Sequence, residues 1–562
     1  MSLAFVRRAR GSALLWLAPL AFLSVFFFYP LAAILRLAGE QALTQGISAL
    51  DWVILGQSFW FTLWQALLST ALTLLIGLPA AYLFARYDFA GKSLLLALTT
   101  VPFILPTVVV AAGFNALLGP HGWINLGLMA LFNLSSPPIQ FLNTLWAILL
   151  AHIFYNTTIV IRVVGNAWSQ LDHRIEQAGQ VLGAHPLRNF LEVSLPLLRQ
   201  SILAAGLLVF LFDFTSFGVI LLLGGPQFAT LEVSIYIQTM QMLNLPLAGL
   251  LSIIQLACTL VLTVLSGQLN RVQNAPLLPR LKGEGSRKAE TWRGRLFVGS
   301  MVFLLVALLI LPMAALTTSS FTRLEANRGE RGTVQTGLTV EYYADLFVNQ
   351  RNSIFYVPPF EAALNSLEYA AITTIISIGL GFLTVYALSH PRRVDQAFGT
   401  LMMLPLGTSA VTLGLGFVVV FNRPPISVGT FPLLIPIAHS LIALPFVVRT
   451  MQPALASIPN TLRQAAAVLG ASPRRVWWEV DLPILAQAAL VSAMFAFTIS
   501  LGEFGATSFL ANPENPTLPV AIYRFLSLPG ASNYGQAMAM ATLLMVLCGG
   551  SILAFERIGR RE

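Results

Sequence analysis

Four ionisable residues stand inside apolar stretches of the chain, where their side chains can meet a solute or only a neighbouring helix. Two are carboxylates: Asp213 and Glu503 precede Phe217 and Phe504 by four residues and by one residue. A charge in the hydrocarbon core of a membrane costs about 2.5 to 3.5 kcal/mol on insertion scales, so such residues usually face a partner or a water-filled cavity. Three interpretations stay open. The carboxylates and phenylalanines line a pathway for a cationic solute, each carboxylate is hydrogen-bonded within its own helix bundle, or each carboxylate gates the pathway without touching the solute.

The other two ionisable residues are His152 and His439, each ten residues before an arginine. Two histidines without a third ligand nearby make a poor metal site, and a lone histidine in a membrane more often hydrogen-bonds a neighbouring helix. We therefore expect a packing role for both and assign no metal site. The sequence has no His-Glu-x-x-His or Gly-x-Ser-x-Gly arrangement, so an integral-membrane enzyme is disfavoured and no catalytic residue is predicted.

The composition shows that the surroundings of these residues are lipid. The 562 residues are 56% hydrophobic and 10% charged, with a mean hydropathy of +0.77, whereas globular domains carry about 25% charged residues. The 32 basic and 23 acidic side chains cannot cover a protein of this size in water. The basic residues, which give a net charge of +9, fall between the apolar runs, so nucleic acid is not an expected partner.

Runs of about 20 apolar residues, enough to cross a membrane as a helix, recur about six times in each half. They lie near 13–37, 63–85, 94–118, 142–161, 202–223, 247–265, 296–316, 367–388, 398–421, 433–448, 488–510 and 537–554. This pattern predicts an all-α integral membrane protein with about 12 transmembrane helices. Asp213 and Glu503 fall about halfway along the fifth and eleventh runs, and Pro102, Pro106 and Pro405 predict kinks.

The orientation of the spans follows from the basic residues beside them, since Lys and Arg resist translocation. An inside N-terminus places most of these residues in the cytoplasm, among them Arg7, Arg8, Arg10, Arg86, Arg174, Arg392, Arg474, Arg475, Arg560 and Arg561. Both termini are therefore expected to be cytoplasmic.

The second half of the chain repeats the first. At an offset of 287 residues, Leu182-Gly-Ala-His-Pro186 matches Leu469-Gly-Ala-Ser-Pro473, and further upstream, at an offset of 304, Gly77 to Tyr82 matches Gly381 to Tyr386. We predict two tandem modules of six spans with the same topology, at 1–270 and 296–562, joined by a basic cytoplasmic connector at 271–295. Repeats of this kind are common in transporters, whose pathway lies between the halves.

Each module has one cytoplasmic segment that is too polar for the bilayer and too apolar for a plain loop. Three residues share one helical face in each copy: Ile175, Ala178 and Leu182 in the first, and Leu462, Ala465 and Leu469 in the second. Gly183 and Gly470 are plausible C-terminal stops. A short amphipathic helix once per half suits docking to a two-fold cytoplasmic partner. The alternative is a helix that lies on lipid headgroups, although such helices favour long basic faces.

These segments resemble the EAA loop of the permeases of binding-protein-dependent ABC importers, in which Glu-Ala-Ala is followed by three residues, Gly and, later, Leu-Pro. The two copies read Glu176-Gln-Ala-Gly-Gln-Val-Leu-Gly-Ala184 before Leu195-Pro196, and Arg463-Gln-Ala-Ala-Ala-Val-Leu-Gly-Ala471 before Leu482-Pro483. The resemblance implies ATPase-coupling roles for Glu176, Gln177, Ala178, Gly179 and Gly183, and for Arg463, Gln464, Ala465, Ala466 and Gly470. Gln177 and Gln464 replace the motif's Glu, so the charge at the docking site departs from the family pattern while the shape is kept.

The resemblance implies a type I ABC importer permease fold in the plasma membrane of a prokaryote. Its partners would be the lipid bilayer, an extracytoplasmic solute-binding protein and an ABC ATPase, expected as a homodimer. The chain has no Gly-x-x-x-x-Gly-Lys-Ser/Thr loop, so we expect a transport subunit without a cofactor of its own, with ATP and magnesium in the partner ATPase. The alternative is a secondary transporter driven by an ion gradient, which needs ionisable relays and no docking helix.

Two further stretches in each half resemble the permeases for iron(III) and thiamine. They are Ser216-Phe-Gly218 with Gly224-Gly-Pro-Gln227, and Gly502-Glu-Phe-Gly505 with Thr517-Leu-Pro-Val-Ala-Ile-Tyr523. The resemblance implies a small cationic solute, with a slight preference for iron(III). The choice stays open, because specificity in such importers lies largely in the binding protein.

Overall fold

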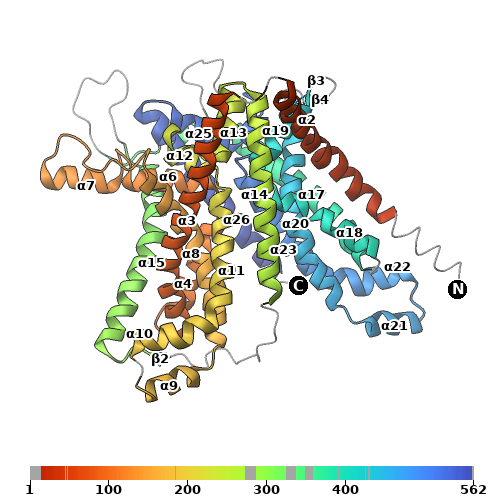
Figure 1. Cartoon of the computed structure of the whole chain (residues 1–562), viewed down its shortest axis with the longest axis horizontal. Coiled ribbons are helices and arrows are strands. Elements are labelled where there is room, and N and C mark those ends of the chain that lie inside the picture. Colours follow the sequence, from red (N-terminus) through yellow and green to blue (C-terminus); the bar gives the residue numbers. More distant parts are fainter. Residues whose placement is uncertain are drawn as a thin grey trace.

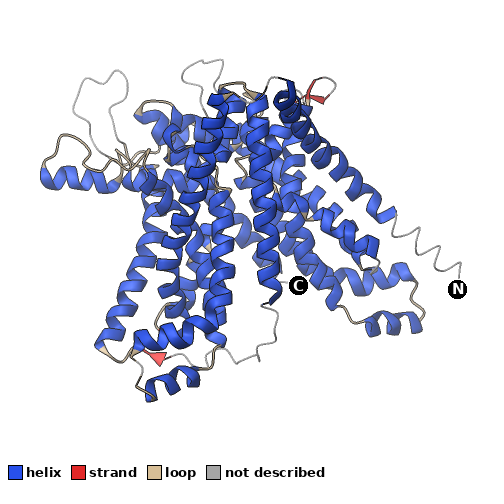
Figure 2. Cartoon of the chain, viewed as in Figure 1, coloured by secondary structure: helices blue, strands red, loops and turns tan. Residues whose placement is uncertain are grey.

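The computed structural model of the chain is a bundle of long helices (Figure 1) with a few very short strands at its periphery (Figure 2). It describes residues 14–44, 46, 48–183, 185–272, 287–323, 337–347, 359–389, 393–423, 426–427 and 431–559. Eleven of the described helices are long and apolar enough to cross a membrane, or twelve if the bent pair Val394–Gly407 and Ala410–Val420 is one span. The prediction of an all-α membrane protein with about 12 spans is confirmed.

The first half begins with a span over Leu14–Glu40 that contains a π-helical turn, η1. Its elements are η1 (Ser24–Phe28), α2 (Tyr29–Thr44), α3 (Ala49–Arg86), β1 (Tyr87–Asp88), α4 (Lys92–Leu98), α5 (Val101–Ile104), α6 (Thr107–Leu118), α7 (Trp123–Phe132), α8 (Leu145–Gln170), α9 (His173–Val181), α10 (Pro186–Asn189), η2 (Phe190–Ser194), α11 (Leu195–Phe214), α12 (Gly218–Leu223), η3 (Pro226–Phe228), α13 (Leu231–Tyr236), η4 (Ile237–Gln241) and α14 (Leu245–Val272).

The second half follows the same order of long helices. Its elements are β2 (Arg287–Lys288), α15 (Trp292–Ser319), α16 (Glu341–Ala344), α17 (Pro359–Leu388), α18 (Arg393–Met402), η5 (Leu404–Gly407), α19 (Ala410–Val420), β3 (Asn422–Arg423), β4 (Ile426–Ser427), α20 (Leu434–Ser457), α21 (Asn460–Val468), α22 (Pro473–Val476), η6 (Trp477–Asp481), α23 (Leu482–Gly502), α24 (Thr507–Leu510), α25 (Leu518–Ser527) and α26 (Ala531–Gly559). Residues 273–286 of the predicted connector lie outside the described residues, as do Arg7, Arg8, Arg10, Arg392, Arg560 and Arg561.

The repeat seen in the sequence recurs in the packing of the helices. In the first half α3 packs on α8 and α11, and in the second half α17 packs on α20 and α23. The crossing point is the same in both halves: a Cβ added at Gly77 would lie 2.7 Å from Cβ of Val160, and one added at Gly381 would lie 2.5 Å from Cγ1 of Val447. Small residues at such crossings let helix backbones approach closely within a membrane.

The first helix of each half crosses over to the other half. Nε1 of Trp16 in the first span donates a hydrogen bond of 2.8 Å to Oδ1 of Asp395 on α18, and the Trp16 ring meets that of Phe398 edge-on. In the same way α15 packs along α6 and α3 of the first half. The halves are therefore held together at their outer faces as well as at the interface between them.

Four predicted spans are interrupted rather than continuous. The run at 94–118 is divided into α4, α5 and α6, with Pro102 in the first turn of α5 and Pro106 just before α6, and the run at 398–421 bends by 97° near Pro405. Proline removes a backbone donor and clashes with the preceding turn, so the expected kinks have become breaks.

The fifth and eleventh runs are also broken, so the expectation that Asp213 and Glu503 lie halfway along continuous spans is wrong. Asp213 lies in the last turn of α11, and Glu503 follows the last residue of α23. The chain resumes as α12 and α24 only after a Phe-Gly pair. A Cβ added at Gly505 would lie 2.9 Å from Cβ of Ala410, the first residue of α19. The glycine therefore allows the segment between α23 and α24 to pack closely against the start of α19.

The crossing glycines give a first prediction. Gly381→Ala should destabilise the folded chain by about 1 to 3 kcal/mol, because the added methyl group overpacks the contact with Val447. Adding Val447→Ala should restore most of the loss, and the pair Gly77→Ala with Val160→Ala should behave alike. The matched control is Gly379→Ala on the same helix, where an added Cβ meets nothing within 4 Å. Thermal unfolding in detergent measures the difference, and equal melting temperatures for the Gly381 and Gly379 variants would contradict the prediction.

Candidate coupling helices and translocation interface

Two short helices, α9 and α21, project from the same end of the bundle (Figure 1). Each follows a long span, α8 or α20, and each is followed by a short helix that starts at a proline, Pro186 or Pro473. A π-helical turn, η2 or η6, then leads into the next span in both halves. The two copies of this segment therefore share even the irregular part of their backbone.

Both helices expose an apolar edge, and the exposure matches residue by residue. The paired values are 46% for Ile175 and 46% for Leu462, 86% for Val181 and 87% for Val468, and 87% for Leu182 and 88% for Leu469. Exposed apolar residues gathered on one element outside the membrane-spanning helices mark a surface for a partner. Ala178, Gln464 and Ala465 are exposed beside them, whereas the Glu176 and Gln177 side chains lie outside the described residues.

Each helix ends at a glycine in the left-handed region, as predicted. Gly183 and Gly470 both have a φ of +84°, which other residues rarely adopt. In the second copy the amide of Ala471 donates to the carbonyl of Ala466 at 3.0 Å, which is the bond that closes a Schellman cap. The caps fix where Leu182 and Leu469 leave their helices, and so fix the direction of the apolar edge.

Gly179, which departs from the Ala of the family motif, has a local explanation. A Cβ added at this position would overlap Oδ1 of Asn189, a buried residue at the end of α10. In the second copy the equivalent of Asn189 is Val476 and the equivalent of Gly179 is Ala466. The two differences between the copies therefore compensate for each other.

The charge difference between the two helices also has a structural basis. Nε of Arg463 lies 2.8 Å from Oδ1 of Asp481, and the Tyr386 hydroxyl donates to Oδ2 of the same carboxylate at 3.1 Å. These contacts tie α21 to its own half. At the equivalent positions the first copy has Glu176 and Ser194, so residue type alone precludes the same ion pair there.

The intramembrane carboxylates each lie against the histidine of their own half. Nδ1 of His152 is 3.3 Å from Oδ1 of Asp213, and Nε2 of His439 is 3.2 Å from Oε2 of Glu503. Asn156 donates to Asp213 at 2.6 Å, and the amides of Ala506 and Thr507 donate to Glu503 at 2.8 and 2.9 Å. All four ionisable side chains are buried. Each carboxylate thus has its partners within its own half. Contact of the carboxylates with a solute stays a prediction.

The two halves build this pair from the same two positions with the residue types exchanged. At the offset of 287, Asp213 corresponds to Ser500, and Ser216 corresponds to Glu503. Ser216 lies 2.9 Å from Nε2 of His152, and Ser500 lies 2.7 Å from Nδ1 of His439. Each histidine thus has a carboxylate near one ring nitrogen and a serine hydroxyl at the other, although the acid lies at opposite ring nitrogens in the two halves. A second hydroxyl joins the acid in each half: Ser69 lies 2.9 Å from Nδ1 of His152, and Thr507 lies 2.7 Å from Nε2 of His439.

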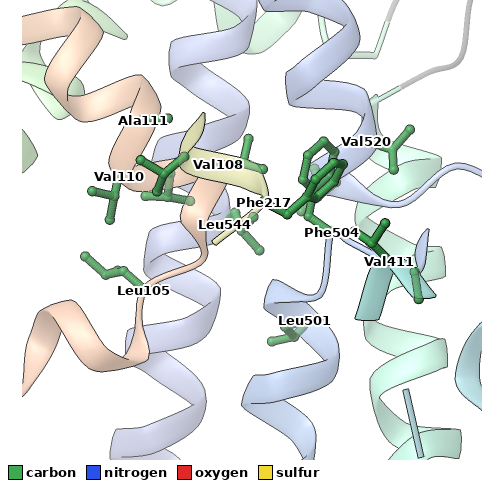
Figure 3. Packing of buried hydrophobic residues seen from close by; sticks show 14 of the residues in the cluster. Leu105, Val108, Val110, Ala111, Phe217, Val411, Leu501, Phe504, Val520 and Leu544 are labelled. Carbon is green, nitrogen blue, oxygen red and sulfur yellow. The ribbon is translucent and has the colours of Figure 1, made fainter. Parts of the chain in front are cut away.

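The breaks that follow these pairs bring Phe217 and Phe504 together from opposite halves. Their rings stack with centroids 5.5 Å apart and planes 24° apart, and Figure 3 shows them face to face among buried aliphatic residues. Tyr236 packs on Phe217 and Tyr523 on Phe504, each at 5.5 Å. We call these four rings the aromatic seal. It fills the interface between the halves with two residues from each.

Sequence reasoning missed one buried acid at this interface, Glu232 on α13. The repeat did not point to it, because the equivalent position in the second half is Pro519. Its position nine residues after a predicted span left it outside the set of intramembrane carboxylates. Tyr236 and Tyr523 were visible as a repeated pair, but only their contacts with the phenylalanines show that they belong to the seal.

The fold and these two features define a class of protein: a membrane permease of two homologous modules, with a closed interface between them and one exposed helix on each. Residues 375–558 match the family model of the binding-protein-dependent transport system inner membrane component. The chain is 26% identical to the probable ABC transporter permease protein y4fN of Sinorhizobium fredii over 96% of its length and 94% of that relative.

Thiamine transport system permease proteins, named ThiP, are similar over nearly the same extent. The protein of Brucella abortus is 28% identical over 88% of this chain and 86% of its own length, and that of Escherichia coli is 25% identical over 91% and 92%. Over most of its length the chain is therefore similar to permease proteins of ABC and thiamine transport systems.

The buried pairs give a second prediction. His152→Gln should lower the stability of the chain by about 1 to 3 kcal/mol, because the ring nitrogens that contact Ser69, Ser216 and Asp213 are lost and these buried polar groups lose a partner. Asp213→Asn should cost less in the His152→Gln background than it does alone, since the contact that it removes is already gone. A double-mutant cycle of thermal unfolding in detergent measures the coupling. The exposed His121→Gln is the control, and strictly additive losses at His152 and Asp213 would contradict the pairing.

Proposed function

We propose that this chain forms the whole translocation pathway of an ATP-driven importer, with one ATPase subunit docked on α9 and another on α21. The observation that carries the proposal is the matched exposure of the two apolar edges. Two identical partners related by a two-fold axis need two equivalent surfaces, and the chain supplies both. Burying a leucine side chain contributes about 1.5 to 3 kcal/mol, so each edge is a sufficient anchor for a partner groove.

In this proposal α9 and α21 face the cytoplasm, and both termini lie on the same side. ATP and magnesium bind in the ATPase, and its closure moves the two helices relative to each other. Movement of one half against the other separates Phe217 from Phe504 and opens the seal toward one face. A solute-binding protein delivers the solute on the opposite face. Asp213 and Glu503, each held beside a histidine of its own half, keep the helix breaks in place while the halves move.

The proposed solute is thiamine or a related organic cation. The named solute of the ThiP relatives supports this choice, whereas the preference for iron(III) drawn from the sequence has less support. Ferric ion favours several anionic oxygen ligands, and the described residues contain no group of three or more His, Cys, Asp or Glu that could hold a metal ion.

The docking proposal gives a third prediction. Leu182→Asp together with Leu469→Asp should reduce the ATPase retained by the purified chain by more than about tenfold, because both anchors become charged. Folding should be unaffected, since both side chains are exposed. ATPase retention is measured by affinity purification of the tagged chain from its own host, followed by mass spectrometry.

The control for this experiment is Leu338→Asp, on the loop before α16, where the leucine is 91% exposed. Full retention of the ATPase by the double variant would refute docking at these two edges. Retention by the single Leu469→Asp variant alone would show that the second edge is not required.

A further inference from the structure

We propose that Glu232 is the residue with which the pathway recognises a positively charged organic solute. This inference rests on the proposed function, because it assumes that the solute passes between the two halves. It adds to the proposed function the chemical class of the solute, an organic cation, and the side chain that recognises this class, Glu232.

Glu232 lies at the junction of the two halves and is 1% exposed. Its carboxylate accepts two hydrogen bonds, one on each oxygen. Nε2 of Gln255 on α14 donates to Oε1 at 2.7 Å from the same half, and Oγ of Ser409 donates to Oε2 at 2.8 Å from the other half. The carboxylate therefore spans the surface along which the halves must separate.

The same short helix carries Glu232 and a residue of the aromatic seal. Tyr236 is four residues after Glu232 on α13, and residues at this spacing share one helical face. Tyr236 contacts Phe217 of its own half and Phe509 of the other half, with ring centroids 5.5 and 5.6 Å apart. The carboxylate is thus one helical turn from the seal, and α13 lies toward the end of the bundle opposite α9 and α21 (Figure 1). A solute delivered to that end meets Glu232 before or at the seal.

No basic side chain is paired with Glu232 in the described residues, which separates it from Asp213, Glu503 and Asp481. Asp395 shares this feature but lies on α18 beside Trp16. Asp213 and Glu503 lie beside histidines and Asp481 beside an arginine, whereas no ion pair joins Glu232 to a basic side chain within the described part of the chain. Ser409 caps α19 through Thr412, so the carboxylate also lies at the positive end of that helix. Burial raises the pKa of Glu232 to about 8, so the closed interface favours the neutral acid, and a cationic ligand is the partner that would restore its charged form.

The surrounding groups fit an organic cation with hydrogen-bond donors. Three nearby acceptors are buried and have no hydrogen-bond partner in the described residues: Oε1 of Gln255, Oγ of Ser252 and Oγ1 of Thr230. Gln255 bonds directly to Glu232, Ser252 precedes it by one turn of α14, and Thr230 precedes α13. The repeat has Pro519 at the position equivalent to Glu232, so this position supplies one carboxylate from the two halves, which matches a single positive charge.

The test is uptake by the full chain in complex with its ATPase, reconstituted in liposomes with its binding protein and radiolabelled thiamine. Glu232→Gln should lower ATP-dependent thiamine uptake by about tenfold or more, because it removes the charge and keeps the shape. Glu232→Asp should retain most of the uptake. Ser409→Ala is the matched control, since it removes the bond between the halves and keeps the carboxylate. The unaltered complex should take up thiamine faster than a neutral analogue with thiophene in place of thiazolium. In the Glu232→Gln variant the two uptake rates should be similar.

The outcomes separate the inference from the function on which it rests. Thiamine uptake by the unaltered complex with undiminished uptake by Glu232→Gln would overturn the inference alone. An equal loss in Ser409→Ala and Glu232→Gln would also overturn it, because Glu232 would then act as a structural bridge. Ferric uptake without thiamine uptake by the unaltered complex would overturn both. Gel-filtration profiles and ATP hydrolysis of each complex establish folding. If the Glu232→Gln complex fails to assemble, the thiamine uptake of the Glu232→Asp complex is compared with that of the Ser409→Ala complex instead.

Discussion

In a membrane, every polar group of the chain must find its partner within the protein, and this constraint shapes the centre of the molecule. The chain breaks its helices at four places between the halves, and each break frees backbone groups that lipid cannot satisfy. Glu503 provides such a partner, since its carboxylate accepts hydrogen bonds from the amides of Ala506 and Thr507 at the start of α24. His439 then joins that carboxylate to Ser500 at the end of α23. The ionisable residues thus stabilise the irregular backbone on which the aromatic seal is built.

The duplication explains most of the architecture, and its exceptions mark where the halves differ in task. Gly77 and Gly381 keep the same crossing, and Gly183 and Gly470 keep the same cap. Arg463 and Asp481 form an ion pair between α21 and the start of the next span, and the equivalent positions hold Glu176 and Ser194 in the first half. Glu232 has Pro519 as its equivalent. These exceptions make the two halves differ in where they carry buried and exposed charge.

Much of this could be predicted from the sequence, because periodicity and repetition are local signals. The exposed helices α9 and α21 were visible through Leu182, Leu469 and the glycines that follow, and the spans through their length. The breaks at Asp213 and Glu503 were not, since an apolar run looks the same whether or not its helix is interrupted. The exchange of acid and serine around the histidines was hidden as well, because it leaves no identical residue at either offset. Glu232 was missed because its partners, Gln255 and Ser409, come from distant parts of the chain.

The central claim is that one chain carries two equivalent docking sites for one kind of ATPase subunit. Native mass spectrometry of the complex purified from its own host measures this most directly, because it counts subunits without labels. Docking of one ATPase subunit on each exposed helix predicts a single species that contains one 61.0 kDa chain and two identical ATPase subunits. A species with one chain and one ATPase subunit, or a folded chain that transports its solute without any ATPase, would contradict it.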